Sequence, residues 1–169
     1  MELTAKQITL FIGVLLTGLS AGLFYAWAVS VIPGTRRITD LAYLETMQSI
    51  NKAIINPAFM IIFFGSVVLL GISTVQHYQS GSIFWVLLAA TATYLIGTIG
   101  VTGMGNVPLN DALEVLKLDK FSLKELATIR KEYETPWNRL HMIRTVFSVL
   151  SFALALAAVF MNSKTNFNQ

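Results

Sequence analysis

The stretch GNVPLNDALEVLKLDKFSLKELATIRKEYETPWNRLHMIRT, residues 105–145, decides how the rest of the chain is arranged. It carries most of the charged residues, two of the four prolines and one of the two histidines, yet a long apolar segment flanks it on each side. Apolar segments of such length are typical of membrane-spanning helices. We therefore read the stretch as a polar excursion between two spans, and we expect the chemistry of the protein to lie there.

The composition is that of a membrane protein. Hydrophobic residues make up 54% of the 169 residues and charged residues 12%, whereas soluble domains usually carry about 25% charged residues. The net charge of +3 is small and there is no basic run, which argues against nucleic acid as a partner. The chain has no cysteine, so disulfides, thiolate metal sites and cysteine nucleophiles are excluded.

Four apolar segments have the length of membrane-spanning helices, about 20 residues. They are residues 8–32, 55–73, 83–104 and 137–161, and two polar segments, 35–54 and 105–136, lie between them. The first polar segment has apolar residues at helical spacing, which indicates an amphipathic helix. We predict an all-α fold, a single integral membrane four-helix bundle with an amphipathic helical cap on one side.

Prolines and capping residues suggest where the helices begin and end. Pro33, followed by glycine, is expected to end the first span. Asn56 and Thr135 each precede a proline, the pattern of a helix start, and should begin the second and the last span.

Capping boxes predict two short helices in the second cap. Asp111, or Asn110 before it, has a glutamate at Glu114 at the spacing of such a box, and Ser122 has one at Glu125. Each box satisfies two backbone N–H groups at a helix start. The second cap is therefore expected to be helical but separate from the last span.

Parity places both caps on one side of the bilayer, and they hold nearly all the lysine and arginine. The positive-inside rule then predicts that the caps are cytoplasmic. Gly18 and Gly22 have the small-xxx-small spacing that lets helices pack closely, so they could join two copies of the chain in a homo-oligomer. The other expected partners are the lipid bilayer and a small hydrophobic molecule.

A polar stripe runs along the third span into the second cap. Its members step by three or four residues and are Thr91, Tyr94, Thr98, Thr102 and Asn106. Two interpretations stay open: the threonines hydrogen-bond their own backbone, or the stripe lines a cavity. Tyr94 favours the cavity because a buried phenol usually needs a partner. Asn51, beside the apolar stripe of the first cap, is expected to point into a pocket under the cap or into solvent.

The start of the last span carries two ionisable residues, His141 and Arg144, on one face. Ionisable groups in or at a membrane are costly and indicate a functional site by default. The alternatives are that Arg144 reaches the headgroups or pairs with Glu132 or Glu134, and that His141 is structural.

Several classes of active site are absent from the sequence. The two histidines are predicted on opposite sides of a hydrocarbon core of about 30 Å, so they cannot share a metal or a haem within one chain. No HExxH, G-x-S-x-G or glycine-rich phosphate loop occurs. We therefore expect no bound metal and no cofactor.

Two motifs carry a resemblance to a known family: Asn106-Val-Pro-Leu-Asn110 and Trp137-x-Arg139-x-His141-x-x-Arg144-Thr145. With them the chain resembles the anthrone oxygenase-like family of small four-span membrane proteins, long catalogued as a domain of unknown function. The segments Gly22-Leu-Phe24-Tyr-Ala and Met47-Gln48-x-Ile50-Asn51 extend the resemblance to nearly the whole chain. The resemblance implies a four-span fold. It also implies oxidoreductase chemistry of the kind by which some fungal members oxidise anthrones to anthraquinones.

That chemistry needs a base, a cation or donor for an enolate oxygen, and an apolar cavity. We assign His141 as the base and Arg144 as the partner of the oxyanion, from their residue types and proximity. The substrate-binding residues are predicted to be Asn51, Asn106, Asn110, Trp137 and Tyr94.

A second hypothesis is a non-enzymatic membrane protein that binds a lipid or hydrophobic ligand, or an accessory subunit of a membrane complex. The same polar residues would then lock the caps to the bundle. Dry, tight packing around His141 and Arg144 favours the lock, whereas an apolar cavity of roughly 300 Å³ opening to the lipid favours a ligand or substrate site.

Overall fold

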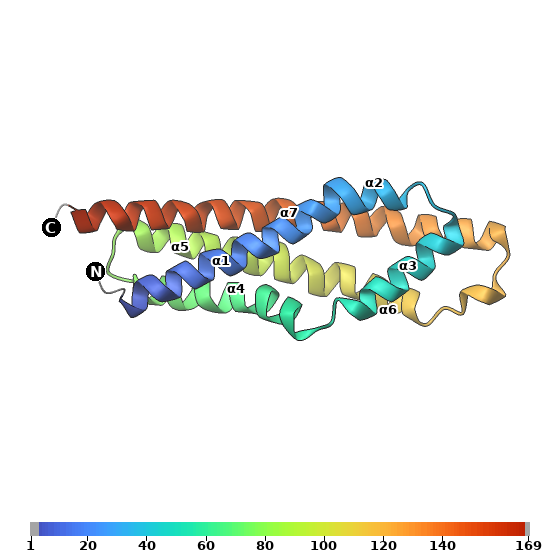
Figure 1. Ribbon diagram of the computed structural model, residues 1–169, viewed down its shortest axis with the longest axis horizontal. Coiled ribbons are helices and arrows are strands. Elements are labelled where there is room, and N and C mark those ends of the chain that lie inside the picture. The colour runs from blue at the N-terminus through green and yellow to red at the C-terminus, as the bar shows by residue number, and fades with distance from the viewer. Residues whose placement is uncertain (1–3, 168–169) are drawn as a thin grey trace.

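The computed structural model describes the backbone of residues 4–167 and the side chains of residues 4–162. Every regular element in this part of the chain is a helix. Four helical stretches are long and apolar enough to cross a membrane: Ala5–Thr35, Pro57–Gln76, Ser82–Glu114 and Leu123–Asn162. The predicted all-α, four-helix membrane bundle is therefore confirmed, and the protein is a multi-pass membrane protein. Figure 1 shows an elongated bundle with both chain ends at one end of the molecule and the caps at the other.

Helix α1 (Ala5–Ala26) packs against α4 (Pro57–Gln76) and α7 (Leu123–Phe167), and α5 (Ser82–Tyr94) packs against α4 and α7. Gly18 lets α1 approach α7, because a Cβ atom there would lie 2.9 Å from Phe152 Cε2. A Cβ at Gly22 would meet no described atom within 4 Å. Gly18 thus has a packing role within the chain, and self-association through Gly18 and Gly22 stays a prediction.

Pro33 does not end the first span, as the sequence had suggested. The helix continues as α2 (Ile32–Thr35) after a π-helical turn over Trp27–Val31, in which the N–H of Ile32 donates to the carbonyl of Trp27, five residues back. A proline lacks an N–H donor and its ring collides with the carbonyl four residues back. The wider turn before the proline accommodates the ring, so the helix goes on.

The third span has the same arrangement at Pro108. Beyond α5 it continues through two π-helical turns, Leu95–Gly100 and Thr102–Asn106, and then into α6 (Val107–Glu114). The predicted capping box at Asn110 or Asp111 is therefore wrong, since both residues lie inside a helix that enters directly from the span. Such wide turns are frequent at functional sites.

Thr135 and Pro136 likewise do not start a helix, because α7 runs unbroken from Leu123 through Pro136. Its start is the predicted capping box: the N–H of Ser122 donates to Glu125 Oε2 at 2.8 Å, and the N–H of Glu125 donates to Ser122 Oγ at 3.4 Å. The part of the second cap from Leu123 onward and the last span are therefore one helix, and Pro136 removes a single backbone donor from it.

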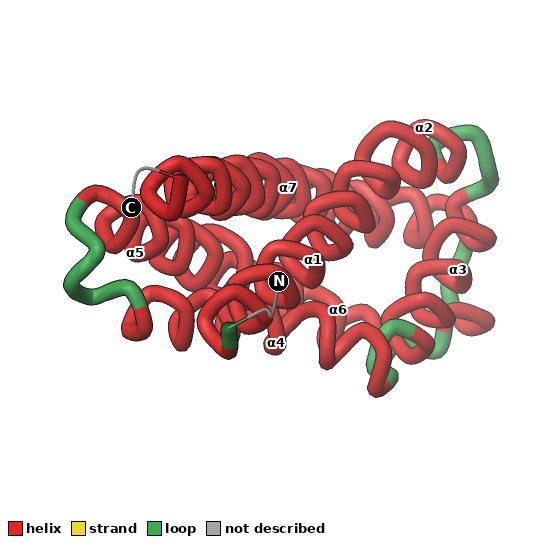
Figure 2. The backbone as a smooth tube through the Cα atoms, turned by 60° about the vertical axis from the view of Figure 1, so that its left-hand side comes forward, coloured by secondary structure: helices red, strands yellow, loops and turns green. Residues whose placement is uncertain are grey.

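The caps form a second core at the end of the bundle. Helix α3 (Asp40–Ala53) buries Tyr43, Leu44 and Met47 against α6 and the first turns of α7. Arg130 of α7 holds the turn before α3, because Nη1 lies 3.1 Å from Asp40 Oδ1 and 2.9 Å from the Ile38 carbonyl oxygen. In Figure 2 the longer loops lie toward the two ends of the molecule, and a short loop joins α3 to α4 between them.

Candidate functional site

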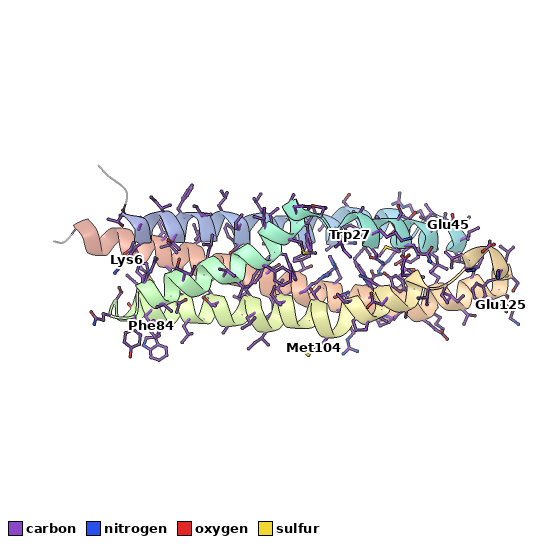
Figure 3. All side chains as sticks on the ribbon, turned by 90° about the horizontal axis from the view of Figure 1, so that it is seen from below. Lys6, Trp27, Glu45, Phe84, Met104 and Glu125 are labelled. Atoms are coloured by element: carbon purple, nitrogen blue, oxygen red, sulfur yellow. The ribbon has the colours of Figure 1, made fainter. Side chains whose placement is uncertain are left out.

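A cavity of about 300 Å³ lies where the caps meet the bundle. Its walls come from the end of α1, the end of α3, the start of α4, α6 and the middle of α7. Figure 3 shows α4 crossing obliquely from α5 toward α1. Trp27 lies near the end of α4 that approaches α1 (Figure 3). The rim includes exposed apolar side chains, Ile55 at 71%, Phe64 at 48% and Val107 at 41% exposure. The cavity therefore opens on a surface that is suited to lipid, as a site for a hydrophobic molecule requires.

His141 lies in the deep wall of the cavity and is fully buried. Its Nε2 lies 3.1 Å from the carbonyl oxygen of Phe24, and its Nδ1 lies 2.9 Å from Arg144 Nη2 and 3.2 Å from Arg144 Nε. A guanidinium can only donate, so Nδ1 is the acceptor and Nε2 carries the proton that is donated to Phe24. The imidazole is thus held neutral, in one tautomer, with its only lone pair turned to Arg144.

Arg144 is 8% exposed and lines the same cavity. Besides His141 it contacts Thr102 Oγ1, 3.4 Å from Nη1, and the faces of Phe24 and Trp137, whose ring centres lie 4.7 Å and 5.1 Å from its Cζ. No ion pair joins it to a carboxylate of the described residues. Glu134, one of the partners considered from the sequence, binds Arg130 instead, at 2.7 Å.

This arrangement leaves a buried cation without a counter-ion. Burying an unpaired charge is strongly unfavourable, and charged groups inside proteins are normally paired. Aromatic faces stabilise a guanidinium only in part, by roughly 2 kcal/mol when desolvated. The wall of the cavity can therefore bind an anionic or strongly polarised oxygen of a ligand.

A hydrogen-bonded chain connects this region to the caps. Asn51 Nδ2 donates to the hydroxyl oxygen of Tyr133 at 3.3 Å, and that hydroxyl donates to Asn110 Oδ1 at 2.9 Å. Trp137 Nε1 donates to the same Asn110 oxygen at 2.8 Å, while its ring stacks on His141 with centroids 5.1 Å apart and an interplanar angle of 6°. The chain orders α3, α6 and α7 around one wall of the cavity.

The structure brings together some of the predicted site residues and separates others from them. Asn51, Asn110, Trp137, His141 and Arg144 all line the cavity. Two others are buried outside its lining: Tyr94 shares a hydrogen bond of 2.7 Å with Ser20, and Asn106 donates to the Trp137 carbonyl at 3.3 Å.

The polar stripe of the third span is divided in the same way. Thr91 donates to the Leu87 carbonyl at 2.8 Å, which is the local bond considered from the sequence. Thr102, three turns further on, reaches Arg144 and lines the cavity. Of the five residues of the stripe, only Thr102 therefore lines the cavity.

Further cavity residues were not identified from the sequence. On α6, Val107, Asp111 and Glu114 line the cavity beside the predicted Asn110, at helical spacing. Glu114 Oε1 also pairs with Lys52 of α3 at 2.6 Å. Helical periodicity in the sequence could have placed these residues on one face, but the interpretation of Asp111 and Glu114 as a capping box concealed it. Phe24 was noted only within a segment that extends the family resemblance, and Trp27 lay in an apolar span where nothing distinguished it from lipid-facing neighbours.

No group of three or more histidine, aspartate or glutamate side chains in the described part of the chain could hold a metal ion. His77 follows the last residue of α4, with its Nδ1 2.8 Å from the Ser73 carbonyl oxygen, whereas His141 lies within α7 and contacts the Phe24 carbonyl oxygen of α1. The two histidines are therefore in separate parts of the fold.

The chain matches the anthrone oxygenase family over residues 46–154, which is more than half of its length. No curated protein is matched, and no solved structure is matched. The matched region begins in α3 and ends in α7, so it includes Asn51, Asn110, His141 and Arg144. The chain therefore belongs to the anthrone oxygenase family.

Proposed function

We propose that the protein is a membrane-embedded oxygenase-like enzyme that oxidises a lipophilic aromatic, anthrone- or quinone-like substrate in this cavity without a bound metal. One observation carries the proposal: the unpaired guanidinium of Arg144 is buried in the wall of a largely apolar cavity. Membership of the anthrone oxygenase family supports the class of substrate. The apolar rim is suited to a molecule that arrives from the bilayer.

Arg144 stabilises the charge that develops on the substrate. An anthrone has a methylene group between two aromatic rings, with a ketone opposite. When the methylene loses a proton, the electron pair is delocalised onto the ketone oxygen and the central ring becomes aromatic. Donors fixed in an apolar site stabilise such an oxyanion more strongly than water does.

His141 takes the proton in this proposal. Its Nδ1 lone pair is held by Arg144 in the resting protein. When the substrate oxygen accepts the N–H donors of Arg144, Nδ1 is released to accept the methylene proton, while Nε2–H stays on the Phe24 carbonyl. One ligand-driven exchange of hydrogen bonds thus activates the base and places the cation.

The carbanion then reacts with dioxygen, which is the oxidant. A carbon–oxygen bond forms, and the resulting peroxide takes the proton back from His141. Cleavage of the O–O bond with loss of the second methylene hydrogen releases water and leaves a new carbonyl. Substrate and dioxygen thus give a diketone and one water, so the methylene carbon is oxidised and both oxygen atoms are reduced.

The test compares three glutamine variants in lipid nanodiscs, with formation of anthraquinone from anthrone as the measurement. His141→Gln and Arg144→Gln should each lower the rate above the protein-free background by about 100-fold or more, as loss of an oxyanion donor does in other enzymes. Arg139→Gln is the matched control, because Arg139 is exposed and outside the cavity lining. Wild-type turnover in Arg144→Gln would contradict the assignment.

One observation favours the alternative function. In that alternative the protein is not an enzyme: it binds a hydrophobic ligand, or it is itself an accessory subunit of a membrane complex. Both ring nitrogens of His141 are engaged within the protein, as in a structural lock. Binding of an aromatic ligand without any turnover by the wild-type protein would favour this reading over an enzyme.

A further inference from the structure

The side-chain amide of Asn110 is held in one orientation. Its Oδ1 atom lies 2.8 Å from Trp137 Nε1 and 2.9 Å from the hydroxyl of Tyr133. An indole nitrogen is a donor only, so the amide atom that faces Trp137 has to be the oxygen. If the amide were flipped, its own N–H groups would face the N–H of Trp137, and the hydrogen bond from Trp137 would be lost.

This orientation turns the amide nitrogen to the cavity. Asn110 lines the cavity on the same face of α6 as Val107, Asp111 and Glu114. Its Nδ2 makes no hydrogen bond to another described residue, and it is not among the buried polar atoms that lack a partner. The amide nitrogen is therefore accessible, on a residue that lines the cavity.

We infer that Asn110 is a second ligand-binding donor of the cavity, for an acceptor oxygen other than the one on Arg144, and that Tyr133 and Trp137 are its positioning residues. The inference rests on the proposed function in that the ligand occupies this cavity. Asn51 supports the arrangement, since its Nδ2 donates to the Tyr133 hydroxyl, which directs the hydroxyl proton toward Asn110.

The ligand is thereby specified in more detail. An unpaired guanidinium and an amide N–H₂ group both stand on the wall of this largely apolar cavity, so the cavity favours a rigid apolar frame with two acceptor oxygens. Each oxygen can be a carbonyl or a phenolate, because both accept hydrogen bonds. Anthraquinone has two such oxygens on three fused rings, whereas anthracene has the same ring frame and none.

Replacement of Asn110 by aspartate separates a donor role from a structural one. Aspartate keeps an oxygen for Trp137 and Tyr133 but presents a second oxygen to the cavity in place of the N–H₂ group. If Asn110 serves only as an acceptor that joins α6 to α7, Asn110→Asp should be tolerated. If it donates to the ligand, the same change should remove the bond and add repulsion.

The experiment measures dissociation constants of anthraquinone and anthracene by quenching of tryptophan fluorescence in nanodiscs. Trp27 and Trp137 line the cavity, and Trp85→Phe removes the remaining tryptophan, which is 66% exposed on α5. In this background Asn110→Asp should weaken anthraquinone binding by about tenfold or more and leave anthracene within about twofold. Tyr133→Phe should weaken anthraquinone binding by a smaller factor, about threefold, again without affecting anthracene.

Each outcome decides a different point. Unchanged binding of anthraquinone to Asn110→Asp, or an equal loss of both ligands, would overturn the donor role and leave the proposed function standing. If the wild-type cavity binds neither anthraquinone nor anthracene, the proposed function fails, and the donor role fails with it.

Discussion

Single side chains decide how closely the third span approaches α7. Gly97 lies in the π-helical turn Leu95–Gly100 and faces Phe147 of α7, and a Cβ atom at Gly97 would overlap the Phe147 ring and its Cβ. The atoms it would meet include some near the backbone of α7, so neither a small rotation of the ring nor a local shift relieves the contact. Overpacking of this kind typically destabilises by about 1–3 kcal/mol.

We therefore predict that Gly97→Ala lowers the free energy of unfolding by about 2–3 kcal/mol. Thermal unfolding in detergent, followed by circular dichroism, measures the change. Gly71→Ala is the matched control, since a Cβ there meets nothing within 4 Å and alanine is the better helix former. Equal melting temperatures for the two variants would show that α7 does not pack on this turn.

At the same scale, sequence could identify the types of residue in the site but not their partners. His141 and Arg144 were identifiable because ionisable groups are rare in spans. Glu134 binds Arg130, and because α7 continues through Pro136 it is about 15 Å along the helix from Arg144, a separation that the expected helix start at Thr135 concealed. Asn110 looked like a cap, and its bonds to Tyr133 and Trp137 join positions 23 and 27 residues away.

Among the elements, α3 depends on one arginine of α7. The side chain of Arg130 is 12% exposed, and its guanidinium lies 4.5 Å from the centre of the Tyr43 ring. It donates to the carbonyl oxygens of Ile38 and Thr35 and forms ion pairs with Asp40 and Glu134. A largely buried, multiply bonded arginine contributes more than a surface ion pair, whose median is about 0–1 kcal/mol.

Arg130→Gln should therefore destabilise the protein by about 2–3 kcal/mol, because it leaves Glu134 and two carbonyls without their donor. Lys131→Gln removes the adjacent, exposed cation and should change stability by less than about 0.5 kcal/mol. Hydrogen exchange should place the loss in α3 rather than in the spans. Destabilisation by Lys131→Gln as large as that by Arg130→Gln would contradict the role of Arg130.

Element boundaries were predictable where the local bonds decide them. Asn56 caps α4 as expected, accepting from the N–H of Phe59 at 3.0 Å, and the Ser122–Glu125 box starts α7. The boundaries at Pro33 and Pro136 were wrong because a proline removes only one backbone donor, and a helix packed on its neighbours continues through it. No local pattern announced the π-helical turns.

For the whole molecule, the number of spans followed from composition because each apolar segment is buried in lipid independently of the others. The common location of both caps also followed, since four crossings put them on one side, and Figure 1 shows them at one end. The cytoplasmic orientation stays a prediction. The cavity was beyond such reasoning, because parts of α1, α3, α4, α6 and α7 converge to form it.

In the proposed function, this cavity oxidises an anthrone with dioxygen. The most direct test measures oxygen uptake and anthraquinone formation together, with wild-type protein in nanodiscs, anthrone and a metal chelator. We predict one dioxygen consumed for each anthraquinone formed, at a rate well above that of empty nanodiscs and unchanged by the chelator. A rate equal to that of empty nanodiscs would contradict the claim, and loss of activity with the chelator would contradict its metal-free form.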